Sequence, residues 1–517
     1  MADDQQDVIA FLSEPSSYRP AIGRVDIIET HASLVFLAGD RAYKLKRAVK
    51  YPYLDFSTAE LRRRACEAEL TLNRRTAPTL YLEVRALTRT SQGRVGFSTA
   101  GTVVDWIVVM RRFDQSSLFE ALARTGGLNA PLMYELAGHI ADFHAVAERR
   151  LHYGGAMGLT DIVEGNHHCL MAARHAGFAF ERIDELHESS QQQLTAVTVV
   201  LERRRAEGKV RHCHGDLHLR NICLLDGKPT LFDCLEFSDA LATIDVLYDL
   251  AFLLMDLEHR GLTNYANLVL NRYLDLTGED DGLPAMHLFL SLRAAIRAHV
   301  TATAMERVAD REAKLEMAAE AGRYLELAAR SLRPRSCQLI AVGGYSGAGK
   351  STLAAALAPS FGARVLRSDV IRKRLCGVAL ETRLPSSAYT ACVSRRVYEA
   401  VRLGASTALA AGYSVVIDAV AMKPEERRSF AAVAEAAAVP FLGLWITAPA
   451  ATMETRLRAR LHDASDASPN ALAQQLVPLH RGFDGLLVVS AQGRQSGGVD
   501  EHFDAAGDAR LSSDEPG

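Results

Sequence analysis

The chain contains 517 residues, of which 48% are hydrophobic and 23% are charged, and it carries a formal net charge of −3. This length favours roughly two to four domains with sizeable hydrophobic cores, and the ordinary composition excludes a fibrous or globally disordered protein. The 59 basic residues are balanced by 62 acidic ones, which excludes nucleic acid as a bulk electrostatic partner.

The start of the chain and its cysteines indicate a cytoplasmic protein. The first residues are acidic and lack the basic and apolar regions of a secretory signal. The eight cysteines have no regular spacing, which is typical of reduced cytosolic thiols. Residues 436–453 carry no charge and approach the length of a membrane span, but Pro440 and Pro449 interrupt them. They predict a buried strand over 441–446, so we expect no membrane contact.

The first hundred residues predict strands around one helix. Residues 25–46 alternate in a strand-like manner around Gly39-Asp40, a turn that is typical of a β-hairpin. Ser57 and Glu60 then form a capping-box pattern, which marks the start of a helix. The predicted apolar face of this helix is formed by Leu61, Ala65, Ala68 and Leu72.

Helical patterns dominate the region that follows. Two more strands are predicted near 80–87 and 106–110 before the helices begin. A strand-rich stretch around 210–237 interrupts the helices, and residues 303–330 predict a single helix. The segment 332–336 breaks the periodicity and is the best candidate for a linker.

The stretch from His212 to Asn221 carries the first chemical motif. Its three histidines and one cysteine raise the alternative of a zinc site, but zinc ligands normally come as short-spaced pairs joined by a longer loop. Asp216 and Asn221 fit the kinase catalytic loop H-x-D-x-x-x-x-N better, in which the Asp accepts the substrate hydroxyl proton and the Asn holds a metal ion. Asp233 ends the next predicted strand, where kinases place a second magnesium ligand.

Two parts of this region resemble the aminoglycoside phosphotransferase and choline-kinase-like superfamily. They are His214-Gly-Asp216-x-His218-x-x-Asn221 and Phe232-Asp233-x-x-Glu236. The region differs from the protein-kinase pattern, because it has neither an A-P-E element nor a G-x-G-x-x-G loop near the start. The resemblance implies a protein-kinase-like bilobal fold in which Asp216 is the catalytic base for phosphoryl transfer from ATP to a small hydroxylated acceptor. Asn221 and Asp233 would hold Mg²⁺.

The same resemblance implies nucleotide-binding residues upstream. The hairpin strand should carry the lysine that contacts the phosphates, and because Lys44 and Lys46 share one face, both remain candidates. The glutamate that pairs with this lysine should lie on the next helix, where Glu69 is closer to the apolar face than Glu67. Met110 lies in a segment that resembles the hinge, which meets adenine through backbone hydrogen bonds.

A second motif begins after the linker. An apolar strand over 338–342 and the alternation of helices and strands after it predict βαβ units and a parallel sheet. Residues 344–351 fit G-x-x-x-x-G-K-[S/T], a loop whose backbone N–H groups surround phosphate oxygens. Lys350 would reach the outer phosphates and Ser351 would ligate Mg²⁺. The other nucleotide-binding positions that we predict are Gly344, Ser346, Gly347, Ala348, Gly349 and Thr352.

The residues after this loop resemble small P-loop kinases of the gluconate-kinase and polynucleotide-kinase type. The resemblance implies that Asp369 and Arg372 meet an acceptor, although Asp369 is also placed to cap a helix, and one residue can do both. Asp418 ends a buried strand at the Walker-B-like position that holds magnesium, with a plain turn residue as the alternative. Arg456 and Arg460 resemble the lid arginines that contact phosphoryl oxygens.

The whole arrangement over residues 8–490 resembles bacterial proteins described as fused phosphotransferase and P-loop ATP-binding proteins. We expect an α+β kinase-like domain at 1–332, a linker at 333–337, an α/β P-loop kinase or ATPase domain at 338–490, and a disordered acidic tail at 491–517. Both domains are expected to bind ATP and Mg²⁺. The alternative is a regulatory protein in which one nucleotide site senses or gates the other. The sequence leaves the acceptor and the oligomeric state open.

Overall fold

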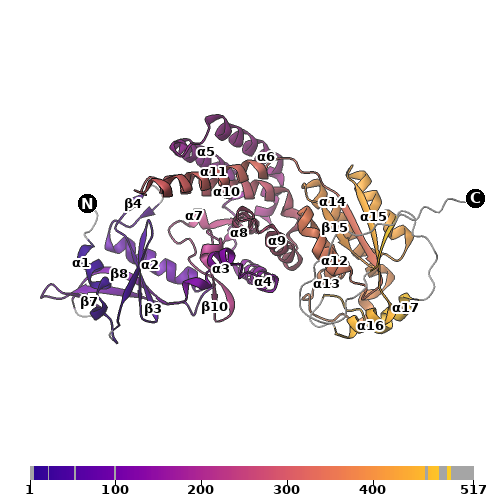
Figure 1. Cartoon of the computed structure of the whole chain (residues 1–517), viewed down its shortest axis with the longest axis horizontal. Helices are drawn as coiled ribbons and strands as arrows, with labels where there is room; N and C mark the ends of the chain where they lie inside the picture. The colour runs from indigo at the N-terminus through magenta and orange to yellow at the C-terminus, as the bar shows by residue number, and fades with distance from the viewer. Residues whose placement is uncertain are drawn as a thin grey trace, which may run out of the picture.

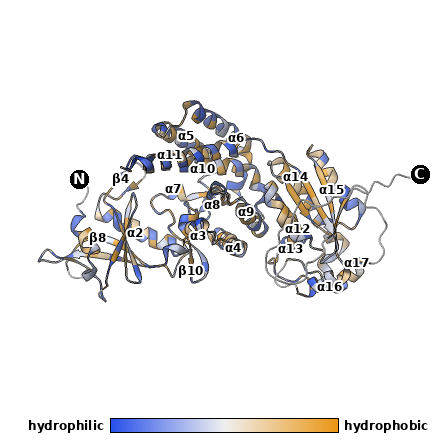
Figure 2. Ribbon diagram, in the orientation of Figure 1, coloured by the Kyte–Doolittle hydropathy of each residue, from blue (hydrophilic) through white to orange (hydrophobic). Residues whose placement is uncertain are grey.

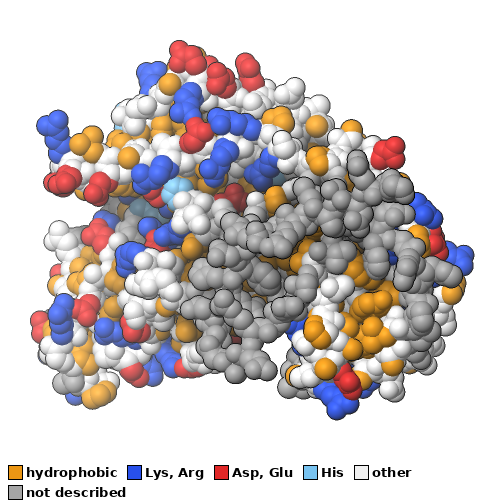
Figure 3. All heavy atoms as spheres, turned by 45° about the vertical axis from the view of Figure 1, so that its right-hand side comes forward, with side chains coloured by type: hydrophobic (Ala, Val, Ile, Leu, Met, Phe, Trp, Pro, Cys, Tyr) orange, Lys and Arg blue, Asp and Glu red, His pale blue; other side chains and the backbone are white. Residues whose placement is uncertain are grey.

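A computed structural model describes residues 5–20, 22–51, 54–97, 101–459, 464–476 and 486–490. The tail predicted at 491–517 lies outside these residues. An N-terminal lobe built on a sheet, a helical lobe and a C-terminal α/β body follow one another along the long axis of the molecule (Figure 1). On the face drawn in Figure 3, acidic and basic side chains are interspersed, in line with the small net charge.

The N-terminal lobe contains an antiparallel six-stranded sheet with the order β1-β2-β3-β8-β6-β7. Its strands are β1 (Val25–Glu29), β2 (Ser33–Ala38), β3 (Arg41–Lys46), β6 (Tyr81–Arg89), β7 (Val95–Gly96) and β8 (Thr102–Arg111). The hairpin predicted around Gly39-Asp40 is confirmed as the β2–β3 connection. Helix α1 (Gln6–Ser13) lies at one end of the sheet, and α2 (Ala59–Asn73) packs against β6 and β8.

Helix α2 differs from its prediction in two respects. Its N-cap is Thr58, whose side chain accepts a hydrogen bond from Leu61 N, whereas the hydroxyl of Ser57 donates to Asp55. The predicted capping box was therefore wrong by one residue. The predicted apolar face is only half-buried, because the helix is rotated by one residue to bury a largely polar face. The buried residues of α2 are Arg62, Cys66, Glu69 and Asn73.

The helical lobe surrounds two short two-stranded sheets, β10-β11 and β12-β9, and the motif at residues 212–221 runs from the end of β9 to β10. Its helices are α3 (Phe119–Thr125), α4 (Ala130–Val146), α5 (Gly155–Ala172), α6 (Phe180–Ala206), α7 (Asp239–Ala242), α8 (Val246–His259), α9 (Thr263–Thr277), α10 (Leu283–Met305) and α11 (Arg311–Ser331). Its strands are β9 (Val210–His212), β10 (Ile222–Leu225), β11 (Lys228–Leu231) and β12 (Thr243–Asp245). Most residues of α8 and α10 are buried in the main hydrophobic core.

The prediction of one helix over 303–330 was wrong. The chain leaves α10 after Met305, and α11 starts anew with Asp310 as its N-cap, whose carboxylate accepts a hydrogen bond from Ala313 N at 2.8 Å. Helix α11 then packs along α10. No described helix is long and apolar enough to cross a membrane.

The C-terminal body is a parallel five-stranded sheet with the order β14-β15-β13-β16-β17, as the sequence predicts. Its strands are β13 (Leu339–Gly344), β14 (Arg364–Arg367), β15 (Val415–Asp418), β16 (Phe441–Thr447) and β17 (Leu486–Ser490). Its helices are α12 (Lys350–Leu357), α13 (Ser368–Leu375), α14 (Ala391–Ala410), α15 (Pro424–Ala436), α16 (Ala450–Ala459) and α17 (Pro469–Gln475). The strands are strongly hydrophobic (Figure 2), and their carboxyl ends meet at one edge, where such sheets bind ligands.

Candidate active sites

An ion-pair network joins the two lobes of the kinase-like part. The ammonium of Lys44 on β3 lies 2.7 Å from Glu69 Oε1 and 2.6 Å from Asp233 Oδ1. The ammonium of Lys46 pairs with the other oxygen of Glu69 and with Glu236. Glu69 on α2 is fully buried and holds both lysines, one on each carboxylate oxygen.

The ion pairs distinguish Glu69 from Glu67, and they involve both Lys44 and Lys46. Glu69 is the buried ion-pair partner, whereas Glu67 is exposed and pairs with Arg63. Burial raises the pKa of Glu69, but its two lysines outweigh burial and bring the pKa to about 2. Burial lowers the pKa of Lys44, but Asp233 and Glu69 raise it well above its ordinary value. Glu69 and Lys44 are therefore both charged at neutral pH.

Asp249 on α8 holds the backbone of the loop that contains Asp216. Its carboxylate accepts the backbone N–H groups of His214 at 3.1 Å and Gly215 at 2.9 Å. Asp216 follows these two residues, and its Oδ2 accepts a hydrogen bond from Asn221 Nδ2 at 2.7 Å. Because 39% of the Asp216 side chain is exposed, its carboxylate is held in place and still accessible to a substrate.

Asp216 is ionised in this environment. Burial raises the pKa of Asp216, but His218, His214 and Arg297 outweigh burial and hold this pKa below its ordinary value. The Nε2 atom of His218 lies 3.4 Å from Asp216 Oδ2. A carboxylate of this kind orients a hydroxyl group and accepts its proton late in the transfer.

The oxygen atoms beside Asp216 fit a magnesium ion. Asn221 uses its amide nitrogen for the backbone oxygen and side chain of Asp216, which leaves its Oδ1 for a cation. Asp233 adopts a left-handed backbone conformation, with φ of 61°, and 39% of its side chain is exposed. One amide oxygen and one carboxylate are ligands of the type that Mg²⁺ prefers.

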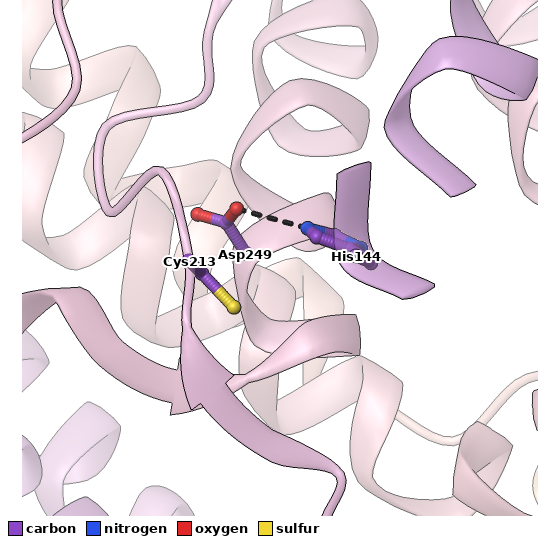
Figure 4. A group of neighbouring side chains, drawn as sticks. All are labelled: His144, Cys213 and Asp249. Carbon is purple, nitrogen blue, oxygen red and sulfur yellow. Dashed lines mark hydrogen bonds and ion pairs between the residues drawn. The ribbon is translucent and has the colours of Figure 1, made fainter. Parts of the chain in front are cut away.

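The side chains do not support the zinc alternative for the stretch from His212 to Asn221. His214 Nε2 contacts the backbone oxygen of Phe232 at 2.9 Å, and His218 faces Asp216. Among the described residues, the one set with metal-like spacing is the buried group His144, Cys213 and Asp249 (Figure 4).

That group is a hydrogen-bonded cluster. His144 Nε2 lies 3.1 Å from Asp249, and its Nδ1 lies 2.9 Å from the hydroxyl of Tyr273. The thiol of Cys213 donates to the backbone oxygen of Ile244, and burial raises its pKa well above its ordinary value. The cluster thus orients Asp249, which in turn holds the catalytic loop. No sequence pattern pointed to His144, which lies far from the motif along the chain.

Met110, which we predicted at the hinge, lies inside the sheet. Met110 is still within β8, with Ala42 and Tyr81 of the neighbouring strands on its two sides. The chain leaves the sheet after Arg111, so backbone groups free for adenine begin later than Met110. Phe113 packs edge-on against Phe232, with ring centres 5.4 Å apart, and these rings form an apolar wall at this end of the cleft.

In the C-terminal body, residues 344–351 connect β13 to α12 as the motif requires. Gly344 and Gly347 have positive φ of 141° and 82°, and a Cβ atom at either would collide with a backbone oxygen, that of Ile446 or Met453. Helix α12 begins at Lys350, so its N-terminus faces the loop. The remaining predicted positions lie in the same loop and first helical turn: Ser346, Ala348, Gly349 and Thr352.

The loop has polar neighbours that the sequence motif does not include. The backbone N–H of Ser346 donates to Gln475 Oε1 at 2.9 Å, and Gln475 Nε2 donates back to the Ser346 hydroxyl at 3.1 Å. Arg456, which we predicted as a lid arginine, donates to the backbone oxygen of Ala348 at 3.3 Å and so contacts the loop. Arg460 lies outside the described residues.

Two acidic residues gather at the carboxyl edge beside this loop. Asp418 ends β15 and accepts a hydrogen bond from Ser351 Oγ at 2.6 Å, which places two predicted magnesium ligands together. Asp369 lies inside the first turn of α13, whose N-cap is Arg367, so Asp369 is not the capping residue. Burial and the nearby Asp418 raise the pKa of Asp369, against opposing effects of Ser465 and nearby cations.

Arg372 lies one helical turn after Asp369 and is 7% exposed. It donates to the backbone oxygen of Ala388 at 2.8 Å, and its guanidinium lies 4.7 Å from the ring centre of Tyr389. Its Nε is buried without a hydrogen-bond partner among the described residues. Asp369 and Arg372 therefore lie on the same side of α13, with one guanidinium donor still available.

Comparisons with known proteins match both parts of the chain. A family described as "Phosphotransferase enzyme family" matches residues 126–289, and one described as "AAA domain" matches residues 339–480. Uncharacterized proteins of Mycobacterium tuberculosis (strain ATCC 25618 / H37Rv) and Mycobacterium bovis are each 33% identical over 464 residues, which cover 87% of this chain and 89% of theirs.

Solved structures resemble the two parts separately. A choline/ethanolamine kinase family protein from Mesorhizobium loti is 13% identical and covers 62% of this chain and 99% of its own, with a TM-score of 0.36. A gluconokinase from Sinorhizobium meliloti 1021 is 21% identical and covers 31% of this chain and 86% of its own, with a TM-score of 0.23. The chain belongs to the family of the mycobacterial proteins, and it combines a protein-kinase-like phosphotransferase domain with a P-loop kinase-like domain.

Proposed function

We propose that the protein is an ATP-dependent phosphotransferase with two Mg²⁺–ATP sites, whose N-terminal site phosphorylates a small hydroxylated acceptor. The observation that carries this proposal is the exposed, ionised carboxylate of Asp216, hydrogen-bonded to Asn221, together with the ion pair of Lys44 and Asp233. These four groups supply the base, the metal oxygens and the phosphate cation that phosphoryl transfer needs.

The proposed reaction transfers the γ-phosphoryl group of ATP to the hydroxyl group of the acceptor. The acceptor hydroxyl oxygen forms a bond to the γ-phosphorus of ATP, the bond from that phosphorus to the β–γ bridging oxygen breaks, and ADP leaves. The hydroxyl proton passes to Asp216. Mg²⁺ held by Asn221 and Asp233 would neutralise charge on the phosphates. When ATP binds, the ammonium of Lys44 would leave Asp233 and pair with a phosphate oxygen, while Glu69 holds the same ammonium in place.

The P-loop domain supports a second phosphotransferase activity. Lys350 and Ser351 would contact phosphates and metal, and Asp418 already lies beside Ser351. The raised pKa of Asp369 makes it a stronger base than an ordinary carboxylate, which suits proton abstraction from an acceptor. The available donor of Arg372 would orient that acceptor.

One observation favours the regulatory alternative as a second candidate. Arg364 on β14 is 1% exposed and lies 2.7 Å from both Asp275 and Asp280 of the helical lobe. The same strand ends at Arg367, whose Nε lies 3.4 Å from Asp418. Strand β14 therefore connects the edge of the P-loop site to a buried contact with the kinase-like domain, through which occupancy of one site would affect the other.

Separate inactivation of the two sites tests these proposals. ADP release is measured for the wild type, Asp216→Asn, Lys350→Ala and the double variant. Two independent activities predict that each single variant keeps the activity of the other site. The regulatory candidate predicts that Lys350→Ala changes the rate of the step that requires Asp216. If Asp216→Asn leaves all phosphoryl transfer intact, the N-terminal assignment is wrong.

A further inference from the structure

Arg307, Tyr51 and His31 lie far apart in the sequence but contact one another in the structure. Arg307, just after α10, donates to the hydroxyl of Tyr51 at 3.3 Å, and its guanidinium lies 5.5 Å from the centre of that ring. Tyr51 belongs to strand β4 (Lys50–Tyr51), and its hydroxyl lies 3.4 Å from the backbone oxygen of His31. Figure 1 shows β4 beside the junction of α10 and α11, so these contacts join the N-terminal lobe to the helical lobe.

These groups lie within electrostatic range of the catalytic carboxylates. Burial lowers the pKa of His31, Arg307 lowers it further, and Asp216 and Asp233 raise it. From the helical side, Arg297 of α10 is among the cations that lower the pKa of Asp216. Its guanidinium lies 5.6 Å from the ring centre of Tyr324 on α11. On the helical side of the hollow between the lobes, Lys, Arg and His side chains lie among acidic ones (Figure 3).

Arg297 and Arg307 each contact an aromatic ring. Among the described residues, neither makes an ion pair with a carboxylate, and their contacts are the aromatic residues Tyr324 and Tyr51. On α11, by contrast, Arg323 pairs with Glu320. Guanidinium groups that stack on aromatic rings and keep free N–H donors are well suited to binding carboxylates and phosphates.

From this arrangement we infer that the acceptor of the N-terminal site is an anion, a hydroxylated molecule that also carries a carboxylate or a phosphate. The inference rests on the proposed function. The acidic group of the acceptor would bind Arg297 and Arg307, while the hydroxyl group of the acceptor reaches Asp216. A cationic amino alcohol would meet two unpaired arginines, which disfavour it by like-charge repulsion.

Charge-matched acceptors test this inference in the intact protein. ADP release with Mg²⁺–ATP is measured across a library of hydroxylated metabolites sorted into carboxylates, phosphates, neutral polyols and amino alcohols. We expect the highest kcat/KM within one of the two acidic classes, and the comparison of carboxylates with phosphates distinguishes the two sources of charge. A neutral or cationic best acceptor that still requires Asp216 overturns the inference and leaves the proposed function standing. No Asp216-dependent ADP release with any class contradicts the proposed function itself.

Two variants and one matched control test the arginines directly. Arg307→Gln and Arg297→Gln should each raise KM for the best acidic acceptor about tenfold or more, because a charge-assisted hydrogen bond is lost. They should leave KM for ATP within about twofold, which shows that the nucleotide site is intact. Arg323→Gln, on α11 and paired with Glu320, should change neither constant. Unchanged acceptor KM in both arginine variants overturns the inference.

Discussion

Replacing Glu69 by Gln removes the negative charge that holds both lysines of the N-terminal site. A lowering of the Glu69 pKa from 4.5 to about 2 corresponds to about 3 kcal/mol of favourable interaction between the carboxylate and Lys44 and Lys46. Breaking a buried ion pair from one side typically costs about 3–5 kcal/mol, because the remaining charges stay buried. We therefore expect Glu69→Gln to lower the free energy of unfolding by about 3 kcal/mol and to raise KM for ATP at least about tenfold.

The assay is urea unfolding of the full chain, followed by ADP-release kinetics at saturating acceptor. Glu67→Gln is the matched control, two residues away on the same helix but exposed and paired with Arg63, and it should cost less than about 1 kcal/mol. The stabilisation by Glu69 should be present above pH 4.5 and fall as the pH approaches 2, since its pKa is lowered by folding. Equal effects of the two variants would refute this account of the network.

Three further changes have defined outcomes. Gly347→Ala would push a Cβ atom into the backbone of Met453, so fluorescent ATP-analogue binding to the P-loop domain, measured in an Asp216→Asn background, should be lost. Arg364→Ala would remove the buried guanidinium that pairs with Asp275 and leave Asp280 with Arg374 alone, lower stability by about 3–5 kcal/mol, and split one calorimetric transition into two. The activity that depends on Asp369 should fall as the pH drops through the raised pKa of this carboxyl, so its acid limb should lie above pH 3.8 and disappear in Asp369→Asn.

The features that could be predicted from the sequence are those whose residues are contiguous. Asp216 and Asn221 lie within one short loop, and residues 344–351 form another. The spacing of the residues within each loop is therefore enough to predict that they lie close together. The parallel sheet was predictable because its central strands β13 and β15 are buried and mostly apolar. A local pattern is sufficient in these cases because the neighbours along the chain are also the neighbours in space.

The rotation of α2 shows why other features could not be predicted. Its buried face contains Arg62 and Glu69, and Arg62 pairs with Asp105 at 2.7 Å inside the lobe. Hydrophobic periodicity cannot detect a face that is stabilised by buried ion pairs with distant partners. The same holds for Arg364, whose partners lie in the other domain, and for Gln475 at the phosphate loop.

The most direct test of the central claim is ³¹P NMR of the reaction of Mg²⁺–ATP with the best acceptor. The wild type should produce ADP and a phosphorylated acceptor in equal amounts. Asp216→Asn should lose this product but still bind ATP, because Lys44 and Glu69 remain in place. Asp226→Asn, an exposed partner of Arg111 outside the cleft, should behave like the wild type. Formation of the same product by Asp216→Asn at the wild-type rate would contradict the account.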